Sequence, residues 1–349
     1  MIPVFDGHND TLQRIVAAGE GGAALWQAGG GVGHLDLPRA QAGGLVGGFF
    51  AIWIPSPQTL DDVDHVHAME NPPFALPLPD EIPAATALPH AFAQAAALRM
   101  LERTGTLSVV TTAAELHAAL AAGRFAAVLH MEGAEAIADP DALHLWHGMG
   151  LRSLGPVWSR PTRFGHGVPF AFPASPDLGG PLTEAGRALV RDCNALGIML
   201  DLSHLNEAGF DDIARLSDAP LVASHSAVHA ICASSRNLTD RQLRQIADSG
   251  GLVGLNFASS FLRPDGRRLP LQDLGVMLRH LDHLLGILGE DGVALGSDFD
   301  GALMPRDLPD AAALPRLLEA MAAHGYGEAL IRKIACGNWI SMLERTWRS

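Results

Sequence analysis

Short apolar runs alternate with amphipathic stretches along most of this chain, and this alternation limits the folds that it can adopt. Eight runs have the length and composition of buried strands, at residues 4–5, 44–54, 125–131, 151–157, 197–202, 220–224, 251–257 and 292–296. Between them, apolar residues recur with helical spacing, most clearly over 91–104, 113–122, 184–196, 207–216, 239–249 and 271–288. Repeated strand–helix units imply parallel strands with right-handed crossovers. Eight such units predict an α/β fold of the (β/α)8 TIM-barrel type.

The same units could instead form an open, doubly wound sheet, but no GxGxxG fingerprint follows the first strand. The chain has 349 residues and shows no internal linker, so we expect one barrel domain over 1–349. Two Pro-rich insertions, near 55–90 and 159–182, interrupt the repeat after strands. In a barrel both would rise from the face that carries active sites, where long loops shape a substrate site.

Charge, hydropathy and cysteine content narrow the class of protein. The net charge of -14 provides no basic surface for nucleic acid. No apolar run reaches the ~18 residues that a bilayer span needs, and no basic stretch followed by a long apolar run marks a signal peptide. We therefore expect a cytoplasmic protein without a membrane or nucleic-acid partner. Its three scattered cysteines are expected to be buried free thiols: Cys193, Cys232 and Cys336.

Side chains that can bind metals follow five of the predicted strands. A single histidine or aspartate at a strand end is more often a helix cap or a hydrogen-bond partner than a ligand. Here, however, the carboxyl ends of parallel barrel strands would bring all of them to one face. Imidazole and carboxylate groups suit Zn²⁺ and related divalent ions. The joint pattern, with five metal-type residues at four of the eight strand ends, indicates a metal site formed by His8, Asp10, Glu132, His204 and His225, and Asp298 and Asp300 follow the eighth strand.

The spacing of these residues favours two ions. His8 and Asp10 are two positions apart, so on a strand their side chains share a face and can hold one ion. His204 and His225 can hold a second ion, and Glu132 can bridge the two through its two oxygens. Two ions about 3.5–4 Å apart would acidify a water held between them and polarise a carbonyl group.

Other residues near these motifs are expected to have different roles. The only lysine, Lys333, lies in a C-terminal helical pattern far from any strand end, so a carboxylated lysine cannot bridge the ions. In "IPVFDGHND", at residues 2–10, Asn9 is expected to point away from the site. Asp6 is expected to hold the turn or His8 in place.

Longer motifs distributed from one end of the chain to the other are more specific. They are "FDGHND" at 5–10, "AGGLVGGFFAIW" at 42–53, "MEGAEAI" at 131–137, "LDLSHLNE" at 200–207, "VASHSAVHAICASSRNLTD" at 222–240, "GGLVGLNF" at 250–257, "LDHLLGILGEDGVALGSDFDG" at 281–301 and "GNWISMLE" at 337–344. With them the chain resembles the membrane (renal) dipeptidase family, zinc peptidases of the amidohydrolase superfamily. The resemblance implies a distorted (β/α)8 barrel with two zinc ions, a dipeptide substrate and a homodimer.

The resemblance also implies roles for single residues. His8 and Asp10 match the ligands of one zinc ion, His204 and His225 those of the other, and Glu132 the bridge. Asp298 matches the family's acid/base aspartate. Arg236, in "ASSRN", matches the arginine that takes the C-terminal carboxylate of the substrate. By itself Arg236 could equally be a surface residue or a helix-end ion pair, although a guanidinium group is a natural partner for a carboxylate.

One departure from the family concerns the segment after the fourth strand. Members carry a Thr-His pair there, and its histidine contacts the substrate. This chain continues instead as "VWSRP" over 157–161. His166, several residues further on, is predicted to reach back to the substrate, with Arg160 and Arg163 as alternatives. A second departure is that animal members are secreted and membrane-anchored, whereas neither signal is found in this chain.

These observations lead to the hypothesis of a dipeptidase in which a hydroxide bridging two zinc ions attacks the peptide carbonyl. Asp298 would accept the hydroxide proton and pass it to the leaving amine. Arg236 would favour dipeptides over longer chains, and L-Xaa-D-Xaa dipeptides would be included because family members often accept them. Two alternatives remain. One is a metal-dependent hydrolase of another amide or a lactone. The other is a non-catalytic metal-binding protein, against which the presence of Asp298 counts.

Overall fold

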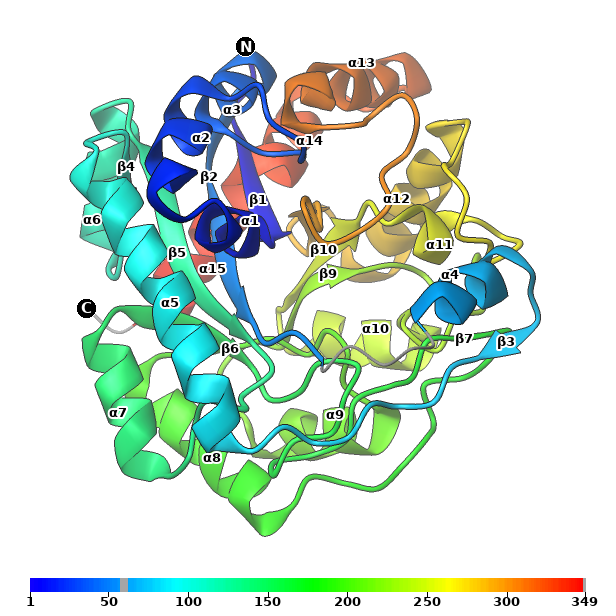
Figure 1. Ribbon diagram of the computed structural model, residues 1–349. Helices are drawn as coiled ribbons and strands as arrows, with labels where there is room; N and C mark the ends of the chain where they lie inside the picture. Colours follow the sequence, from blue (N-terminus) through cyan, green and yellow to red (C-terminus); the bar gives the residue numbers. More distant parts are fainter. Residues whose placement is uncertain (57–61, 348–349) are drawn as a thin grey trace.

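Eight parallel strands form a ring in the computed structural model, which describes residues 1–56 and 62–347 (Figure 1). Each predicted apolar run contributes one of these strands. In order around the ring they are β1 (Val4–Asn9), β2 (Leu45–Trp53), β5 (Phe125–Glu132), β6 (Leu151–Gly155), β8 (Met199–Leu200), β9 (Val222–Ser226), β10 (Leu252–Asn256) and β11 (Val293–Gly296).

The ring closes through two short junctions. Hydrogen-bonded ladders join β1-β2-β5-β6-β8 and, separately, β11-β10-β9. A parallel bridge between Asp201 and Val222 connects β8 to β9, and another between Asn9 and Phe299 connects β1 to the segment after β11. At the second junction the Asp10 N–H donates to the Phe299 carbonyl at 2.8 Å. The prediction of a distorted (β/α)8 barrel is confirmed, and an open doubly wound sheet is excluded.

The two Pro-rich insertions meet each other. β3 (Phe74–Ala75) lies in the first insertion and β7 (Ala171–Phe172) in the second, and they pair as an antiparallel ribbon. The two insertions thus form one layer beside the barrel opening.

A further short strand, β4 (Leu107–Val109), pairs with the first half of β5, whereas β6 pairs with the second half.

Helices cover the outside of the ring (Figure 1). Within the described residues they are α1 (Thr11–Ala17), η1 (Gly19–Gly21), α2 (Gly22–Ala28), α3 (Leu37–Gly43), α4 (Asp62–Glu70), α5 (Ala84–Arg103), α6 (Ala113–Ala121), α7 (Pro140–Gly148), α8 (Glu184–Leu196), α9 (Glu207–Leu216), α10 (Asp240–Asp248), α11 (Ser259–Leu262), α12 (Gly275–Leu288), η2 (Ala311–Ala313), α13 (Leu314–His324), α14 (Glu328–Arg332), η3 (Lys333–Gly337) and α15 (Asn338–Thr346). No helix among these residues combines the length and apolarity that crossing a bilayer requires.

Helix bounds agree best with the sequence where a capping residue marks the start. The side chains of Thr183, Asn206 and Thr239 each accept a backbone N–H at the start of α8, α9 and α10. The largest difference is α5, which begins at Ala84 rather than at residue 91 because the helix continues through Pro89. Proline removes one backbone donor, and here the surrounding packing outweighs that loss.

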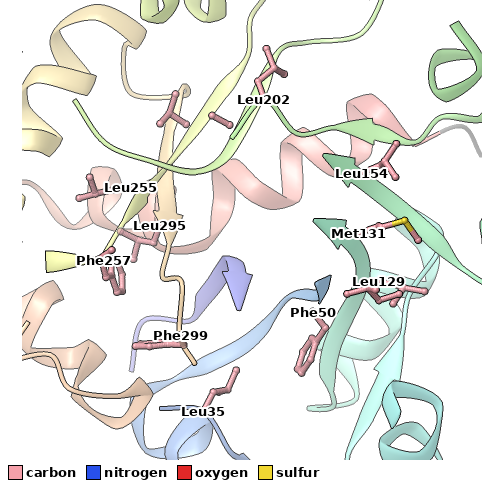
Figure 2. Packing of buried hydrophobic residues seen from close by; sticks show 14 of the residues in the cluster. Leu35, Phe50, Leu129, Met131, Leu154, Leu202, Leu255, Phe257, Leu295 and Phe299 are labelled. Carbon is pink, nitrogen blue, oxygen red and sulfur yellow. The ribbon is translucent and has the colours of Figure 1, made fainter. Parts of the chain in front are cut away.

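An apolar layer separates the strands from the helices (Figure 2). A second cluster lies beneath the polar end of the barrel, where the Phe49 ring is 5.0 Å from Trp339 of α15 and 6.4 Å from His130. Trp339 Nε1 donates to the Leu295 carbonyl at 2.8 Å. A Cβ atom at Gly7 would collide with the Trp339 ring, so glycine is needed there. As predicted, the three cysteines are free and buried.

Acid should weaken this fold through His280 of α12. The ring is fully buried. Its Nδ1 accepts from Val228 N at 3.1 Å and its Nε2 donates to the Leu262 carbonyl at 2.9 Å, so both bonds require a neutral ring. Burial lowers the pKa of His280 from 6.5 to about 4. Since the unfolded chain then binds the extra proton, the free energy of unfolding falls as pH drops from 6.5 toward 4. The loss from His280 between pH 8 and pH 5 is about 2 kcal/mol.

Urea unfolding at these two pH values, on zinc-loaded wild type and His280→Gln, measures this contribution. The variant should be less stable than wild type at pH 8, because it loses well-made buried hydrogen bonds, and its stability should change less between the two pH values. The difference isolates His280, because every other titrating group is present in both proteins. An equal pH dependence of the two proteins would contradict the assignment.

Candidate metal centre and active site

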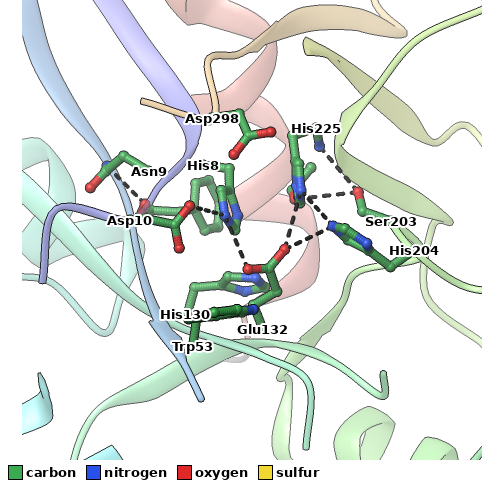
Figure 3. A network of polar contacts seen from close by, with 12 residues as sticks. His8, Asn9, Asp10, Trp53, His130, Glu132, Ser203, His204, His225 and Asp298 are labelled. Carbon is green, nitrogen blue, oxygen red and sulfur yellow. Dashed lines mark hydrogen bonds and ion pairs between the residues drawn. The ribbon is translucent and has the colours of Figure 1, made fainter. Parts of the chain in front are cut away.

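The carboxyl end of the barrel brings the predicted ligands together (Figure 3). His8 and His225 lie within β1 and β9, Glu132 is the last residue of β5, and Asp10 and His204 follow β1 and β8. All five side chains are buried. The predicted strands stopped short of His8 and His225, so these histidines belong to strands rather than to the loops that follow.

Glu132 stands between two groups of ligands. Its Oε1 is 3.0 Å from His204 Nε2 and 3.3 Å from His225 Nε2, whereas its Oε2 is 3.6 Å from His8 Nε2. His8 Nε2 is in turn 3.5 Å from Asp10 Oδ2. Of the three described groups that could hold a metal ion, two contain Glu132, namely His8–Asp10–Glu132 and Glu132–His204–His225, and the third is His8–Asp201–His225. Each oxygen of one carboxylate faces a different group, which is the arrangement that a bridging ligand needs.

The polar atoms of this cluster fit divalent cations. His8 Nε2 and Asp10 Oδ1 are buried and have no hydrogen-bond partner among the described residues, which is costly unless a ligand satisfies them. Burial raises the pKa of Glu132, and the neighbouring carboxylates of Asp10 and Asp298 raise it further. Three carboxylates held together out of water favour cations. Imidazole nitrogen and carboxylate oxygen are ligands that Zn²⁺ prefers.

Serine hydroxyl groups set the orientation of two histidines. Ser224 Oγ donates to Asp201 Oδ2 at 2.6 Å and lies 2.7 Å from His225 Nδ1. Since its only proton is given to Asp201, Ser224 must accept from Nδ1–H of His225, which leaves the Nε2 lone pair for a metal. Ser159 Oγ lies 2.8 Å from His204 Nδ1. These partners were not predicted, although a serine precedes His225 directly in the sequence.

His130 forms the floor of the cluster. It lies on β5 two residues before Glu132, so both side chains face the barrel interior. Its Nδ1 is 2.8 Å from Ser153 Oγ, its Nε2 is 3.6 Å from Asp201 Oδ2, and its ring packs edge-on against His8 at 5.4 Å. Burial lowers the pKa of His130 to about 3, so the ring is neutral. The two-residue spacing to Glu132 was the signal that could have identified it.

Asp298 is placed by an unusual turn after β11. Its φ is 61°, in the left-handed region that residues other than glycine seldom adopt. Its N–H donates to the His8 carbonyl at 3.0 Å, and its Oδ2 accepts from Asn256 Nδ2 at 3.0 Å. A Cβ atom at Gly301 would collide with the carboxylates of Asp10 and Asp298, so only glycine lets them approach. Asn256, the polar residue that ends β10, was overlooked in the sequence.

Arg236 is buried rather than on the surface, with 3% of its area exposed. Its Nη2 donates to the His225 carbonyl at 2.8 Å and its Nη1 to Ser226 Oγ at 3.0 Å. Its Nε is buried without a partner in the described chain, and the guanidinium lies 5.8 Å from the Phe261 ring centroid. No carboxylate in the described ranges pairs with it, and it is not among the residues that line the neighbouring cavity.

A cavity of about 350 Å³ opens beside these groups and has room for a small molecule. Asp10, Glu132, His204 and Asp298 lie on its polar side. The walls combine polar and apolar groups in about equal measure, and both insertions contribute to them. The remaining lining residues are Gln13, Trp53, Met69, Trp158, Phe170, Ala258, Ser260, Phe261, Arg268, Asp300, Gly301, Ala302 and Leu303.

His166 does not reach this cavity, which corrects the predicted substrate contact. Its carbonyl accepts from Asn206 N at 3.2 Å, and its ring lies against Gly179 and Gly180, because the 159–182 insertion folds back toward the start of α9. The alternatives are also held elsewhere. Arg160 is buried in an ion pair with Glu135 at 2.6 Å.

Arg163, the other alternative, donates to the Ala138 carbonyl outside the cavity. The segment after β6 instead contributes Trp158 to the cavity wall, with its ring 5.8 Å from the His204 ring.

Asp6 holds the His8 strand in place, as predicted. Its Oδ1 accepts from His8 N at 3.4 Å and from Ser297 N at 2.7 Å. Asn9 points to β2 and donates to the Phe49 carbonyl at 2.9 Å.

Comparison with known proteins agrees with this geometry. The model of the family described as membrane dipeptidase (peptidase family M19) matches residues 1–348. A metallopeptidase from Rhodobacter sphaeroides, solved with a phosphinate mimic of the dipeptide L-Ala-D-Ala, is 59% identical, with a TM-score of 0.97 and 99% of each chain covered. The metallopeptidase described as dipeptidase AC is 58% identical, with a TM-score of 0.96, and the match covers 100% of this chain and 99% of that one.

A curated relative from Klebsiella pneumoniae, described as an uncharacterized protein in the pqqA 5' region, is 45% identical over 245 residues, or 70% of this chain and 90% of its own length. The family match spans nearly the whole chain, and the barrel places a cluster of metal-binding side chains beside a cavity of suitable size. The chain therefore belongs to the membrane dipeptidase family, peptidase family M19, and is a metal-dependent dipeptidase.

Proposed function

We propose that this dipeptidase uses two zinc ions. His8 and Asp10 would hold one, His204 and His225 the other, and Glu132 would bridge them. The observation that carries the proposal is the position of Glu132, whose two oxygens face the two separate groups. When bound, the ions would supply an acidified water as nucleophile and polarise the peptide carbonyl.

Asp298 is the proposed proton carrier. Asn256 occupies its Oδ2, while its Oδ1 accepts no hydrogen bond from the described residues and lies on the side of Asp10 and Gly301. Asp298 lines the cavity. It can take a proton from the attacking water and return it to the leaving amine, which requires a carboxylate within hydrogen-bond reach of both. The bond to Asn256 keeps the carboxylate from rotating away.

Arg236 is the proposed partner of the C-terminal carboxylate of the dipeptide. Its guanidinium lies between the end of β9 and Phe261, a cavity residue, and it has no carboxylate partner among the described residues. A substrate carboxylate bound beside Phe261 would approach the buried guanidinium, where a charge-assisted pair is shielded from water and strong. Chains longer than a dipeptide would place their carboxylate elsewhere.

Replacing Arg236 by Lys should raise KM for a dipeptide roughly 10- to 100-fold, because a charge-assisted hydrogen bond contributes about 1.5–3 kcal/mol. The decisive readout is the preference for a free dipeptide over its C-terminal amide, measured as a ratio of kcat/KM values. This ratio should be large for wild type and should shrink in the variant. Zinc content and Tm serve as controls, since Arg236 also supports the His225 strand end. An unchanged preference would remove Arg236 from substrate recognition.

The proposed substrates include L-Xaa-D-Xaa dipeptides. Support comes from the Rhodobacter sphaeroides metallopeptidase, which was solved with a mimic of L-Ala-D-Ala. The test is the zinc-loaded enzyme against all four stereoisomers of Ala-Ala, together with an N-acyl amino acid and a lactone. We expect the enzyme to cleave L-Ala-D-Ala. Preparations that hold less than about two zinc ions per chain should be proportionally less active. Turnover of only the lactone or the N-acyl compound would replace the proposal with another hydrolase activity.

A further inference from the structure

Asp300 is the most heavily bonded residue next to the active site. Its Oδ2 accepts from Thr11 Oγ1 at 2.8 Å and from Arg14 at 3.1 and 3.3 Å. Its Oδ1 accepts from His34 N at 2.5 Å, and its own N–H donates to His34 Nδ1 at 2.9 Å. The side chain is 3% exposed. With both oxygens occupied, this carboxylate is not available to bind a substrate or a metal.

These bonds hold the turn that carries Asp298. Asp300 lies two residues after Asp298, and Thr11 directly follows Asp10. Gly301 lies against the carboxylates of Asp10 and Asp298, and its N–H donates to the Asp298 carbonyl at 3.1 Å. Asp300 therefore connects the 298–301 turn, which carries the proposed proton carrier Asp298, to α1. This helix begins directly after the proposed zinc ligand Asp10.

The backbone of this turn needs such support. Asp298 and Asp300 both have positive φ, at 61° and 67°, which is unfavourable for a residue with a side chain. Conformations of this kind persist only where surrounding contacts over-determine them. Within the described turn, Asp298 itself has the Asn256 and His8 contacts, whereas Asp300 has five hydrogen bonds to α1 and the segment before α3.

We propose that Asp300 is a positioning residue for the reaction. By fastening the 298–301 turn to α1, it sets where Asp298 stands relative to Asp10 and the cavity. It acts through Asp298 and touches no reacting atom. The inference rests on the proposed function, because it requires Asp298 to carry the proton. Weakening the anchor should therefore slow turnover, while zinc binding and substrate affinity are largely kept.

Asp300→Asn is the first test, because it keeps the shape of the side chain but replaces one of the two accepting oxygens with an NH₂ group, which cannot accept a hydrogen bond. We expect kcat to fall roughly 100-fold, as for a misplaced catalytic group, with KM within about threefold of wild type and zinc content unchanged. Asp212→Asn is the matched control. The Asp212 side chain is 5% exposed and pairs with Arg187 at 3.3 Å, much as that of Asp300 is 3% exposed and pairs with Arg14 at 3.1 Å, but Asp212 lies on α9 and does not line the cavity.

A double-mutant cycle distinguishes positioning from a structural role. If Asp300 acts through Asp298, then Asp300→Asn should cost less than about threefold in kcat once Asp298 is already Asn, since the group it positions is gone. Three results overturn the inference: multiplicative losses in the double variant, wild-type kcat in Asp300→Asn, or an equal loss in Asp212→Asn. If Asp298→Asn itself keeps full activity, the proposed proton carrier fails and the inference fails with it.

Discussion

Asp298→Asn should lower kcat for dipeptide hydrolysis by roughly 10³-fold, within the range expected for a lost general acid–base group. An amide can still accept a hydrogen bond from Asn256 through one oxygen, so the turn can remain intact. It cannot take a proton from the attacking water or return one to the amine. The measurement is kcat for the best Ala-Ala isomer, with zinc content determined on the same preparation.

The control for this variant is Asp307→Asn, the same chemical change at a half-exposed residue that lies outside the cavity. It should keep wild-type kcat. Zinc content of Asp298→Asn should also match wild type, because both proposed metal groups exclude Asp298. If kcat of Asp298→Asn stays within about tenfold of wild type at full zinc occupancy, another group must carry the proton.

Glu132→Gln should remove at least one of the two expected zinc ions and reduce turnover by more than about 10³-fold at limiting zinc. A glutamine side chain has one acceptor oxygen and one NH₂ group, so it cannot present an oxygen to both groups at once. The NH₂ group would face either His8 or the pair His204 and His225. Metal analysis after dialysis against micromolar zinc, followed by a dipeptide assay, measures both effects.

The same variant should lose most of the thermal stabilisation that zinc confers. Ions that bind only the folded chain stabilise it by about 4 kcal/mol when free zinc exceeds the dissociation constant 1,000-fold. Chelation should therefore lower the Tm of wild type clearly and that of Glu132→Gln only slightly. Glu135→Gln is the matched control, because Glu135 is also buried but pairs with Arg160. It should lower stability yet keep two zinc ions. Full zinc content in Glu132→Gln would refute the bridging role.

The order of strands around the barrel was predictable because each strand is a local apolar run between helical stretches. Their ends were less predictable. β1 continues through Asp6, His8 and Asn9, and β9 continues through His225, although none of these residues is apolar. Backbone pairing with neighbouring strands, rather than side-chain hydrophobicity, defines these ends. Polar residues at the end of a barrel strand are tolerated because they face the site.

By itself, the sequence determined which residues could bind the metals. Histidine and carboxylate groups stand at successive strand ends, and parallel strands in a barrel must bring such ends together. The absence of any lysine other than Lys333 already pointed to Glu132 as the predicted bridge. These conclusions depend on residue type and position along the chain, which the sequence states directly.

Only the tertiary structure decided how the surroundings serve these residues. It placed Trp158 rather than His166 at the cavity wall, buried Arg236 beside β9, and brought Ser224 against His225 and Asp300 against Thr11. Each of these outcomes depends on the path of a long insertion or on contacts between segments far apart in sequence. Such contacts follow from packing of the whole barrel, and no local pattern of residues encodes them.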